Sequence, residues 1–389
     1  MPPDALHIAR RMAGIAPFHV MELLARAHAL EAQGRSIIHM EVGEPDFPTA
    51  EPIVAAGRRA LAEGRTRYTP AAGLAALRQA IADHYQAAEG VMVPVPRILV
   101  TPGASGALLV ALAVLVNPGE QVLMADPGYP CNRHFVRLLD AEAVGIPVGA
   151  DSAYQLTAEL VARHWTDRTV AVLLASPSNP TGTLIDPQAL ADILAVVEAR
   201  GGRVIMDEIY HGLVYGRTAA TALAVSERLF VVNSFSKFYG MTGWRLGWLV
   251  APEGYVRDAE KLLQNLFLAA STPAQYAALA AFTPQAAAIF EARRREFQAR
   301  RDFLLPALRR LGFDIPVAPA GAFYLYAGCG AFTDDSFAFA KTLLEEAGVA
   351  ITPGIDFGVH QANRHVRFAY TNALERLAEG VERLRRALA

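Results

Sequence analysis

The chain has 389 residues, which is more than one ordinary domain needs and suits two domains, or one large domain with a smaller companion. Just over half of the residues are hydrophobic, which is enough for a sizeable core. The 36 basic and 38 acidic residues form no long run of either sign. That balance supplies no electrostatic field for gripping a phosphate backbone, so we expect no nucleic acid partner.

Cysteine usage and hydropathy favour a cytoplasmic protein. The two cysteines, Cys131 and Cys329, cannot form a disulfide framework, and no Cys/His pairing suggests zinc, so we expect two reduced thiols and no metal. Residues 1–12 lack the apolar core of a signal peptide. The longest apolar run, residues 107–116, is about half as long as a membrane span, so we expect no membrane association.

The first predicted elements with a clear pattern lie between about residues 98 and 250, where short apolar runs alternate with longer helical stretches. The short runs are continuously apolar, as expected for parallel strands covered on both faces. This alternation predicts an α/β fold with a mostly parallel, doubly wound sheet. The predicted strands are 98–100, 122–124, 170–175, 204–206 and 229–232, and the helices between them are 104–116 and 187–200.

The pattern changes after about residue 285, where a smaller α+β unit is predicted. We expect an N-terminal segment, 1–44, that joins the small domain, a large domain at 45–285 and a small C-terminal domain at 286–389. The last region contains predicted helices at 291–311, 336–347 and 373–389 and predicted strands at 322–327 and 365–370.

One lysine, Lys237, lies among hydroxyls and glycines after the strand predicted at 229–232. An amine attacks an aldehyde only when it is neutral, and burial with neighbouring positive charge lowers a lysine pKa enough for that. Ser234, Ser236 and Arg245 are donors that a phosphate group would use. A surface lysine in a polar loop would look the same, so the motif is weak by itself.

Three further strand ends carry polar or small residues. Asp207 follows the strand at 204–206, where α/β folds bind ligands, and could pair with a protonated ring nitrogen or merely cap the next helix. Asn179 lies in a rigid Pro/Gly loop and could donate to a phenolate oxygen or only form a turn. Ala104 and Ser105 open a helix whose first N–H groups could bind phosphate, although a simple helix cap is also compatible.

Taken together, these segments resemble the fold type I pyridoxal-phosphate enzymes, specifically the class I/II aminotransferases. The resemblance extends from residues 42–47 to the C-terminal helix, and its most specific part is 234–237 with 243–245. Residues 179–182 and 207–210 follow in the family's order and spacing. The resemblance implies a large domain that binds pyridoxal 5′-phosphate and a ping-pong reaction that moves the amino group of an L-amino acid to a 2-oxo acid.

The resemblance also implies roles for individual residues. Lys237 is similar to the Schiff-base lysine that moves a proton between the substrate Cα and the cofactor C4′. Asp207 would pair with the pyridine nitrogen, and Asn179 and Tyr210 would hydrogen-bond the phenolic oxygen. Tyr129 would stack on the ring. The phosphate would be held by the side chains of Ser234, Ser236 and Arg245 and by the backbone amides of Ala104 and Ser105.

Substrate and subunit contacts follow from the same resemblance. Arg367 matches the arginine that clamps the substrate α-carboxylate, Asn179 would assist it, and Gly43 would approach the substrate through its backbone. Tyr68 matches a tyrosine that reaches the phosphate in a neighbouring subunit, which implies a homodimer with shared active sites. The run 103–105 departs from the phosphate loop of many relatives, so backbone contacts are favoured over a Ser105 hydroxyl contact.

Two questions stay open at this stage. A carbon–sulfur β-lyase on the same fold would use the same residues, whereas a nicotinamide dehydrogenase is disfavoured because no GxGxxG follows a strand. The amino acid substrate is not fixed, but Phe18, Tyr129 and Phe323 are plausible apolar walls that favour a neutral or broad range. Four residues are candidates, by their location only, for binding an acidic substrate side chain: Arg10, Arg11, Arg133 and Lys261. Each of them is more often a solvated surface charge.

Overall fold

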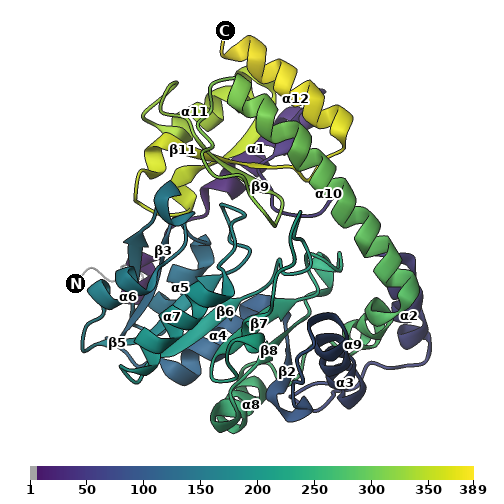
Figure 1. The fold of residues 1–389 in the computed structure, drawn as a ribbon. Helices are drawn as coiled ribbons and strands as arrows, with labels where there is room; N and C mark the ends of the chain where they lie inside the picture. The colour runs from purple at the N-terminus through teal and green to yellow at the C-terminus, as the bar shows by residue number, and fades with distance from the viewer. Residues whose placement is uncertain (1–6) are drawn as a thin grey trace.

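The protein folds around two sheets, which lie one above the other in Figure 1. The structure is a computed structural model that describes residues 7–389. The stretch 1–12, in which no signal peptide is expected, and the segment 1–44 therefore lie partly outside the described residues. Within the described chain, no helix combines the length and apolar character needed to cross a membrane.

The larger sheet has the strand order β2-β8-β7-β6-β5-β3-β4 within residues 7–389. Strands β3 to β7 pair in parallel with their neighbours, whereas β8 is antiparallel to both β7 and β2. The predicted α/β fold with a mostly parallel sheet is therefore confirmed. The strands are β2 (Ile98–Thr101), β3 (Gln121–Asp126), β4 (Glu142–Pro147), β5 (Thr169–Ala175), β6 (Arg203–Asp207), β7 (Phe230–Ser234) and β8 (Gly247–Val250).

Two of these strands are absent from the sequence prediction, for different physical reasons. Strand β4 lies at the edge of the sheet, and its apolar run contains Gly145 and Pro147, two residues that count against a strand prediction. Strand β8 is only four residues long and follows the lysine loop closely. A short strand gives too little pattern to recognise without its partners.

Helices cover both faces of the large sheet, which explains why the inner strands carry apolar residues on both faces. Along β5 (Thr169–Ala175), Val172 and Leu174 belong to one core, whereas Ala171 and Leu173 belong to another. The first core includes residues of α7 (Pro187–Glu198), and the second includes residues of α4 (Gly103–Leu115) and α8 (Val256–Leu266). Two smaller helices, α5 (Pro130–Leu138) and α6 (Ala158–His164), complete the cover.

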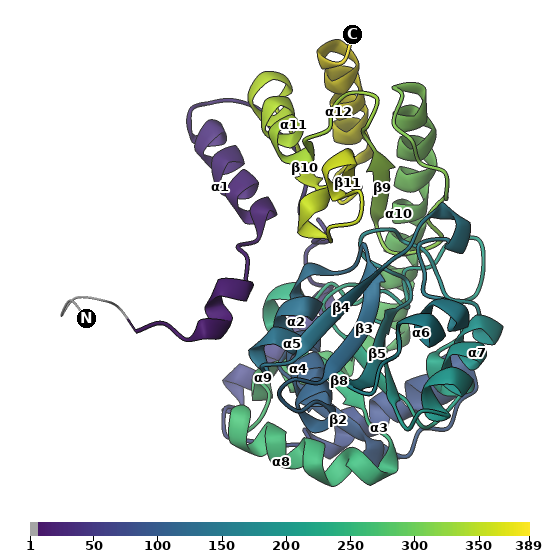
Figure 2. The same ribbon diagram turned by 90° about the vertical axis from the view of Figure 1, so that its left-hand side faces the viewer.

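The smaller sheet brings the two ends of the chain together. Its order is β1-β10-β11-β9, and β1 from the N-terminal segment pairs in parallel with β10. Helix α1 packs against β10 and lies beside this sheet in Figure 2. The domain boundaries at 44/45 and 285/286 stay a prediction. The elements are α1 (His19–Ala32), β1 (Ile38–Met40), β9 (Tyr324–Gly328), α11 (Ser336–Thr342), β10 (Val349–Pro353), β11 (His365–Ala369) and α12 (Leu374–Ala387).

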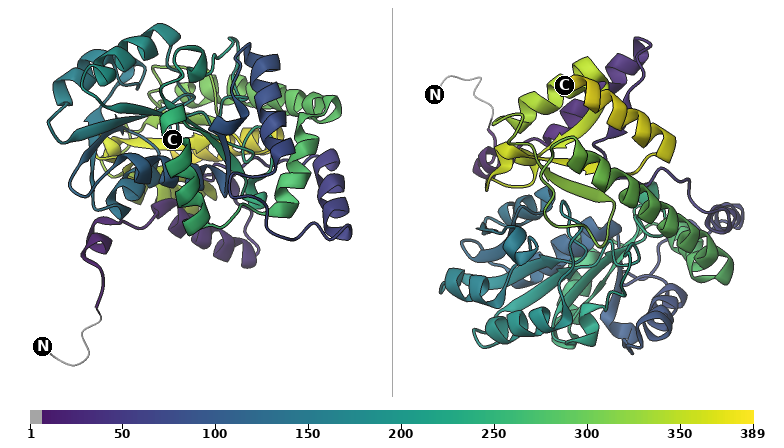
Figure 3. Two further views of the ribbon diagram at one scale, coloured as in Figure 1. Left: turned by 90° about the horizontal axis from the view of Figure 1, so that it is seen from below. Right: turned by 45° about the horizontal axis from the view of Figure 1, so that its top comes forward.

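One long helix, α10 (Pro284–Arg310), links the two regions. It begins earlier than the predicted 291–311, because Thr283 caps it by accepting a hydrogen bond from the backbone N–H of Ala286. The helix packs against α12 at one end and near α2 (Glu51–Ala62) at the other, as Figures 1 and 3 show. Helices α3 (Ala75–His84) and α9 (Thr272–Leu279) pack beside α2 at that end.

Candidate active site

A cavity of about 310 Å³ lies where the carboxyl ends of β5, β6 and β7 meet the small sheet. This is the position in which open α/β sheets bind ligands. The cavity brings most of the predicted site residues together, from segments far apart in the sequence. Its lining includes Gly43, Ala104, Ser105, Tyr129, Asn179, Asp207, Tyr210, Ser236, Lys237, Arg245 and Arg367.

Two predicted site residues do not line this cavity in the single chain. Ser234 is buried beneath it, and its Oγ is 2.9 Å from the Oγ of Ser236. Tyr68 is 82% exposed on the outside of the molecule. An exposed tyrosine is available to a second subunit, and its predicted contact needs one.

Lys237 presents a partly neutral amine to the cavity. Its Nζ donates a hydrogen bond to the backbone oxygen of Gly43 at 2.7 Å. Burial lowers the pKa of Lys237 to about 8, Glu44 opposes this change, and the positive charges of Arg367 and Arg245 add to it. A pKa near 8 leaves a useful fraction of the amine unprotonated at neutral pH, as a nucleophile or a base requires.

Asp207 is the last residue of β6 and is 5% exposed. Its Oδ1 accepts a hydrogen bond from the backbone N–H of Ile209 at 3.0 Å. Burial is the main reason that the pKa of Asp207 rises to about 6, and the charge of Lys237 acts against this rise. The neighbouring Glu208 instead accepts one hydrogen bond from the side chain of Thr221 and one from the backbone N–H of Ala222. It therefore stabilises a loop outside the cavity.

Arg245 and the start of α4 form a site suited to an anion. Gly103 has φ +71°, and a Cβ there would lie 2.7 Å from Nη2 of Arg245, so only glycine allows this approach. Arg245 Nη1 donates to the backbone oxygen of Thr242 at 2.9 Å, which fixes the guanidinium. In the described part of the chain no side chain caps α4, so the N–H groups of its first turn are available to a phosphate.

Arg367 is a fixed, buried cation at another side of the cavity. It is 4% exposed on β11, which lies between β10 and β9 in the small sheet. Its Nη1 donates to Asn179 Oδ1 at 2.9 Å, and its Nη2 donates to the backbone oxygen of Glu41 at 2.6 Å. Its Nε has no partner among the described residues, and a carboxylate would supply one.

Tyr324 is a site residue that the sequence analysis missed. Its ring centre is 4.2 Å from Cζ of Arg367, and its hydroxyl is 2.8 Å from that of Tyr210. The region was predicted as a strand, and an aromatic residue in a strand suggests only core packing. Its closeness to Arg367 depends on the register of β9 against β11, in which Tyr324 pairs with Ala369.

The apolar wall differs in part from the prediction. Phe18 and Tyr129 line the cavity, together with Val20 and Met21 at the start of α1. Phe323 does not reach it, because this side chain is fully buried and packs edge-on against Tyr210, with ring centres 5.4 Å apart.

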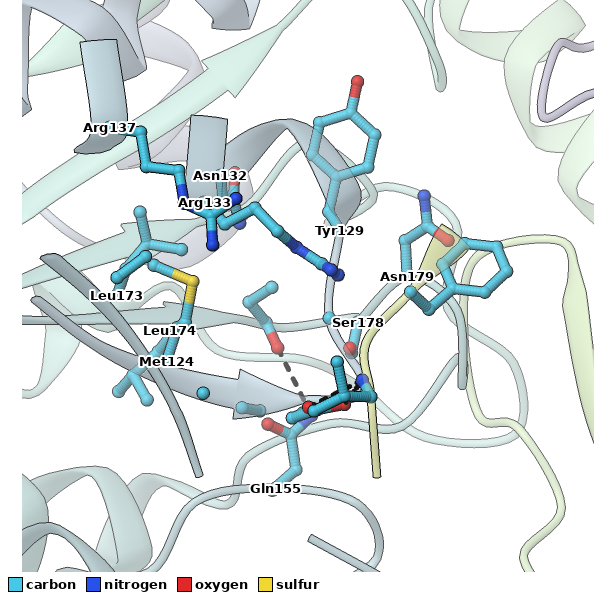
Figure 4. A pocket seen from close by; sticks show the side chains of 18 residues that line it. Met124, Tyr129, Asn132, Arg133, Arg137, Gln155, Leu173, Leu174, Ser178 and Asn179 are labelled. Atoms are coloured by element: carbon cyan, nitrogen blue, oxygen red, sulfur yellow. Dashed lines mark hydrogen bonds between the residues drawn. The ribbon is translucent and has the colours of Figure 1, made fainter. Parts of the chain in front are cut away.

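Of the four candidates for reading an acidic side chain, Arg133 lies nearest to the cavity. It lines a second cavity of about 180 Å³ that shares Tyr129 and Asn179 with the first, and it extends toward Asn179 in Figure 4. Its Nη2 donates to the backbone oxygen of Asp356 at 3.3 Å. The other candidates are engaged or exposed elsewhere: Arg11 pairs with Asp140, Lys261 pairs with Asp258, and Arg10 is exposed.

Comparison with known proteins identifies the family of the chain. The family model for aminotransferase class I and II matches residues 35–384. The chain is 39% identical over 375 residues to a valine–pyruvate aminotransferase of Mycobacterium tuberculosis, covering 96% of each chain. It is 37% identical over 384 residues to a (5-formylfuran-3-yl)methyl phosphate transaminase of Methanocaldococcus jannaschii, covering 98% of this chain and 99% of the relative. The crystal structure of an aminotransferase from Mycobacterium tuberculosis superimposes with a TM-score of 0.95 at 39% identity, covering 99% of both chains.

The fold and these solved relatives define a fold type I pyridoxal-phosphate enzyme. Because the family model spans most of the sequence, the chain belongs to the class I and II aminotransferases. It is a pyridoxal 5′-phosphate-dependent enzyme that moves the amino group of an amino acid to a 2-oxo acid. The alternative of a carbon–sulfur β-lyase is not favoured, since the matching relatives are named aminotransferases.

Proposed function

We propose that Lys237 is the catalytic residue and binds the cofactor as a Schiff base through Nζ. The observation that carries this proposal is the position of the amine, which lies inside the cavity, 2.7 Å from the backbone oxygen of Gly43. The sequence has three lysines. Lys261 and Lys341 pair with acidic side chains elsewhere, and neither lines the cavity.

The residues of the cavity fit pyridoxal phosphate at both ends. Gly103, Arg245 and the open first turn of α4 suit the phosphate group. Asp207 is a buried carboxylate that a protonated ring nitrogen would stabilise. We assign the other cofactor contacts to Ala104, Ser105 and Ser236 at the phosphate, to Tyr129 against the ring, and to Asn179 and Tyr210 at the phenolic oxygen. Ser234, which lies beneath the cavity, would act on the phosphate through its hydrogen bond to Ser236.

Each polar group then has a defined task in amino transfer. The bound cofactor supplies an electron sink for the pair of electrons left on the substrate Cα. Arg367 binds the substrate α-carboxylate, with Asn179 and the backbone of Gly43 beside it, and so orients the Cα–H bond toward Lys237. Once the substrate amino group has displaced Lys237 from the cofactor, Nζ is a free neutral amine, which would accept the Cα proton and return it on the cofactor side.

The test of this assignment uses two lysine variants. Lys237→Ala should lose the absorbance of covalently bound cofactor and lose transaminase activity, because no other lysine in residues 7–389 lines the cavity. Lys261→Ala is the matched control, since Lys261 lies on α8 and pairs with Asp258, and it should keep both. Retention of the absorbance and activity by Lys237→Ala would refute the assignment.

The functional unit that we propose is a homodimer with shared active sites, in which Tyr68 reaches the phosphate site of the partner subunit. Tyr68 is exposed, and so are the apolar side chains of Leu266 and Leu268. The side chain of Thr272 donates to the backbone oxygen of Arg67 at 2.7 Å, which holds the Tyr68 segment beside the start of α9. This arrangement leaves Tyr68 available for contact with a second subunit.

The amino donor that we propose is a neutral amino acid with an apolar side chain. Phe18, Val20 and Met21 give the cavity an apolar wall. Its basic lining residues are Lys237, Arg245 and Arg367, and each already has a task in the proposed mechanism. A valine–pyruvate aminotransferase among the relatives agrees with this choice, although the phosphate-bearing substrate of another relative shows how far the family varies.

We propose a cytoplasmic location for the enzyme. Cys131 and Cys329 are both unpaired, and Cys329 is buried. Unpaired thiols are compatible with a reducing compartment. Recovery of the activity in the cytosolic fraction of its native cells would support this location.

A further inference from the structure

We propose that Tyr324 is a positioning residue whose hydroxyl donates a hydrogen bond to Tyr210 and so makes Tyr210 a stronger donor to the phenolic oxygen of the cofactor. Arg367, which lies against the ring of Tyr324, strengthens this donation. The inference deepens the proposed function, because it relies on the roles proposed for Tyr210 and Arg367. It adds a second connection between the carboxylate-binding arginine and the cofactor.

The position of Tyr324 is fixed from several sides. The side chain is 1% exposed, and its ring centre lies 4.2 Å from Cζ of Arg367. Its hydroxyl is 2.8 Å from the hydroxyl of Tyr210. A Cβ at Gly43 would lie 1.9 Å from the same hydroxyl, so the absence of a side chain at Gly43 makes room for it. Such a buried hydroxyl has little freedom to choose another partner.

The direction of the hydrogen bond follows from counting protons. Each tyrosine hydroxyl carries one proton and can also accept. If Tyr210 gives its proton to the cofactor oxygen, the bond between the two hydroxyls must be donated by Tyr324. A donor that itself receives a hydrogen bond is polarised and becomes stronger.

Arg367 contributes through its charge. A guanidinium against the face of an aromatic ring attracts the ring's electrons, which makes the hydroxyl of Tyr324 a better donor. Arg367 also contacts Asn179 directly, through Nη1 and Oδ1 at 2.9 Å. Two routes therefore lead from the arginine to the phenolic oxygen, one through Asn179 and one through Tyr324 and Tyr210. A substrate carboxylate bound to Arg367 would weaken both.

The test is a pH titration of the absorbance of the purified holoenzyme, whose midpoint reports the pKa of the bound cofactor. Tyr324→Phe should raise this midpoint by about 0.3 to 1 unit, the range that one hydrogen bond between neutral groups can give. Tyr210→Phe should raise it further. In the Tyr210→Phe background, Tyr324→Phe should add nothing, because Tyr324 acts through Tyr210.

Tyr326→Phe is the matched control. Tyr326 lies on the same strand and is buried, and its hydroxyl has no hydrogen-bond partner among the described residues. Its removal should leave the midpoint unchanged. Tyr324→3-fluorotyrosine keeps the ring, and its hydroxyl is a stronger hydrogen-bond donor, so it should lower the midpoint. This variant tests the inference even if Tyr324→Phe does not fold.

An unchanged titration midpoint in Tyr324→Phe would overturn the inference. So would a Tyr324→Phe shift of the midpoint that is as large in the Tyr210→Phe background as in the wild type. These outcomes differ from a failure of the proposed function. In that case the wild-type holoenzyme itself would show no pH-dependent absorbance.

Discussion

At the scale of single residues, the role that we propose for Asp207 at the cofactor comes at the expense of the fold. Its carboxylate is buried in the cavity, and burial raises its pKa from 3.8 to about 6. Because the folded pKa lies above the unfolded one, the ionised carboxylate destabilises the cofactor-free protein at any pH above about 6. As the pH falls from 6 toward 4, the group takes up its proton in the folded state first, and this destabilisation disappears.

Asp207→Asn should therefore raise the free energy of unfolding of the cofactor-free enzyme by about 1 to 3 kcal/mol at pH 8. The same change should slow transamination, because an amide cannot hold a proton on the ring nitrogen. Chemical denaturation at pH 8 and pH 4 measures the first effect, and the gain should shrink at pH 4. A gain of equal size at both pH values would contradict this explanation.

At the scale of elements, helix α1 connects the N-terminal segment to the substrate wall. The backbone N–H groups of His19 and Val20 both donate to the carboxylate of Asp356, at 2.9 Å. This capping fixes the first turn of α1, from which Val20 and Met21 line the cavity. The wall therefore depends on a carboxylate outside the cavity lining.

Asp356→Ala should loosen that turn and raise the KM for an apolar donor such as valine, with a smaller effect on kcat, because the proton-transferring groups are untouched. Half-reactions with valine and with aspartate, followed by cofactor absorbance, measure the effect. The wild type should react faster with valine, and the variant should lose part of that preference.

Asp335→Ala is the matched control for this prediction. Asp335 caps α11 in the same way, by accepting hydrogen bonds from the N–H groups of Phe337 and Ala338, but it does not line the cavity. Each variant should lose about 1 kcal/mol of stability from its cap, and only Asp356→Ala should change KM. Faster reaction of the wild type with aspartate would contradict the apolar assignment.

The sequence predicts those parts of the site that follow strongly apolar strands. Asp207 ends one buried strand of the large sheet and Lys237 comes shortly after another, so their meeting at one edge follows from the α/β pattern. The burial of Arg367 and its contact with Tyr324 depend on how β9, β10 and β11 pair with one another. These three strands lie apart in the sequence. Strand register of this kind is not encoded in any single segment.

At the scale of the whole molecule, the cavity combines residues from both sheets, and Tyr68 lies outside it. We expect a dimer in sedimentation velocity and a weaker affinity for the cofactor in Tyr68→Phe, by about ten- to a hundredfold, the loss expected for one hydrogen bond to a phosphate. Tyr276→Phe is a suitable control, because Tyr276 lies on α9 but does not line the cavity. A monomer with full cofactor affinity and activity would contradict the shared site.

The central claim is that Lys237 holds the cofactor, and the chain is well suited to a direct test because it has three lysines. Reduction of the holoenzyme with borohydride fixes the cofactor to the amine that carries it, and peptide mapping by mass spectrometry then identifies that amine. We predict the modification on the peptide that contains Lys237 and none on those that contain Lys261 or Lys341. Modification of another lysine, with Lys237 unmodified, would contradict the claim.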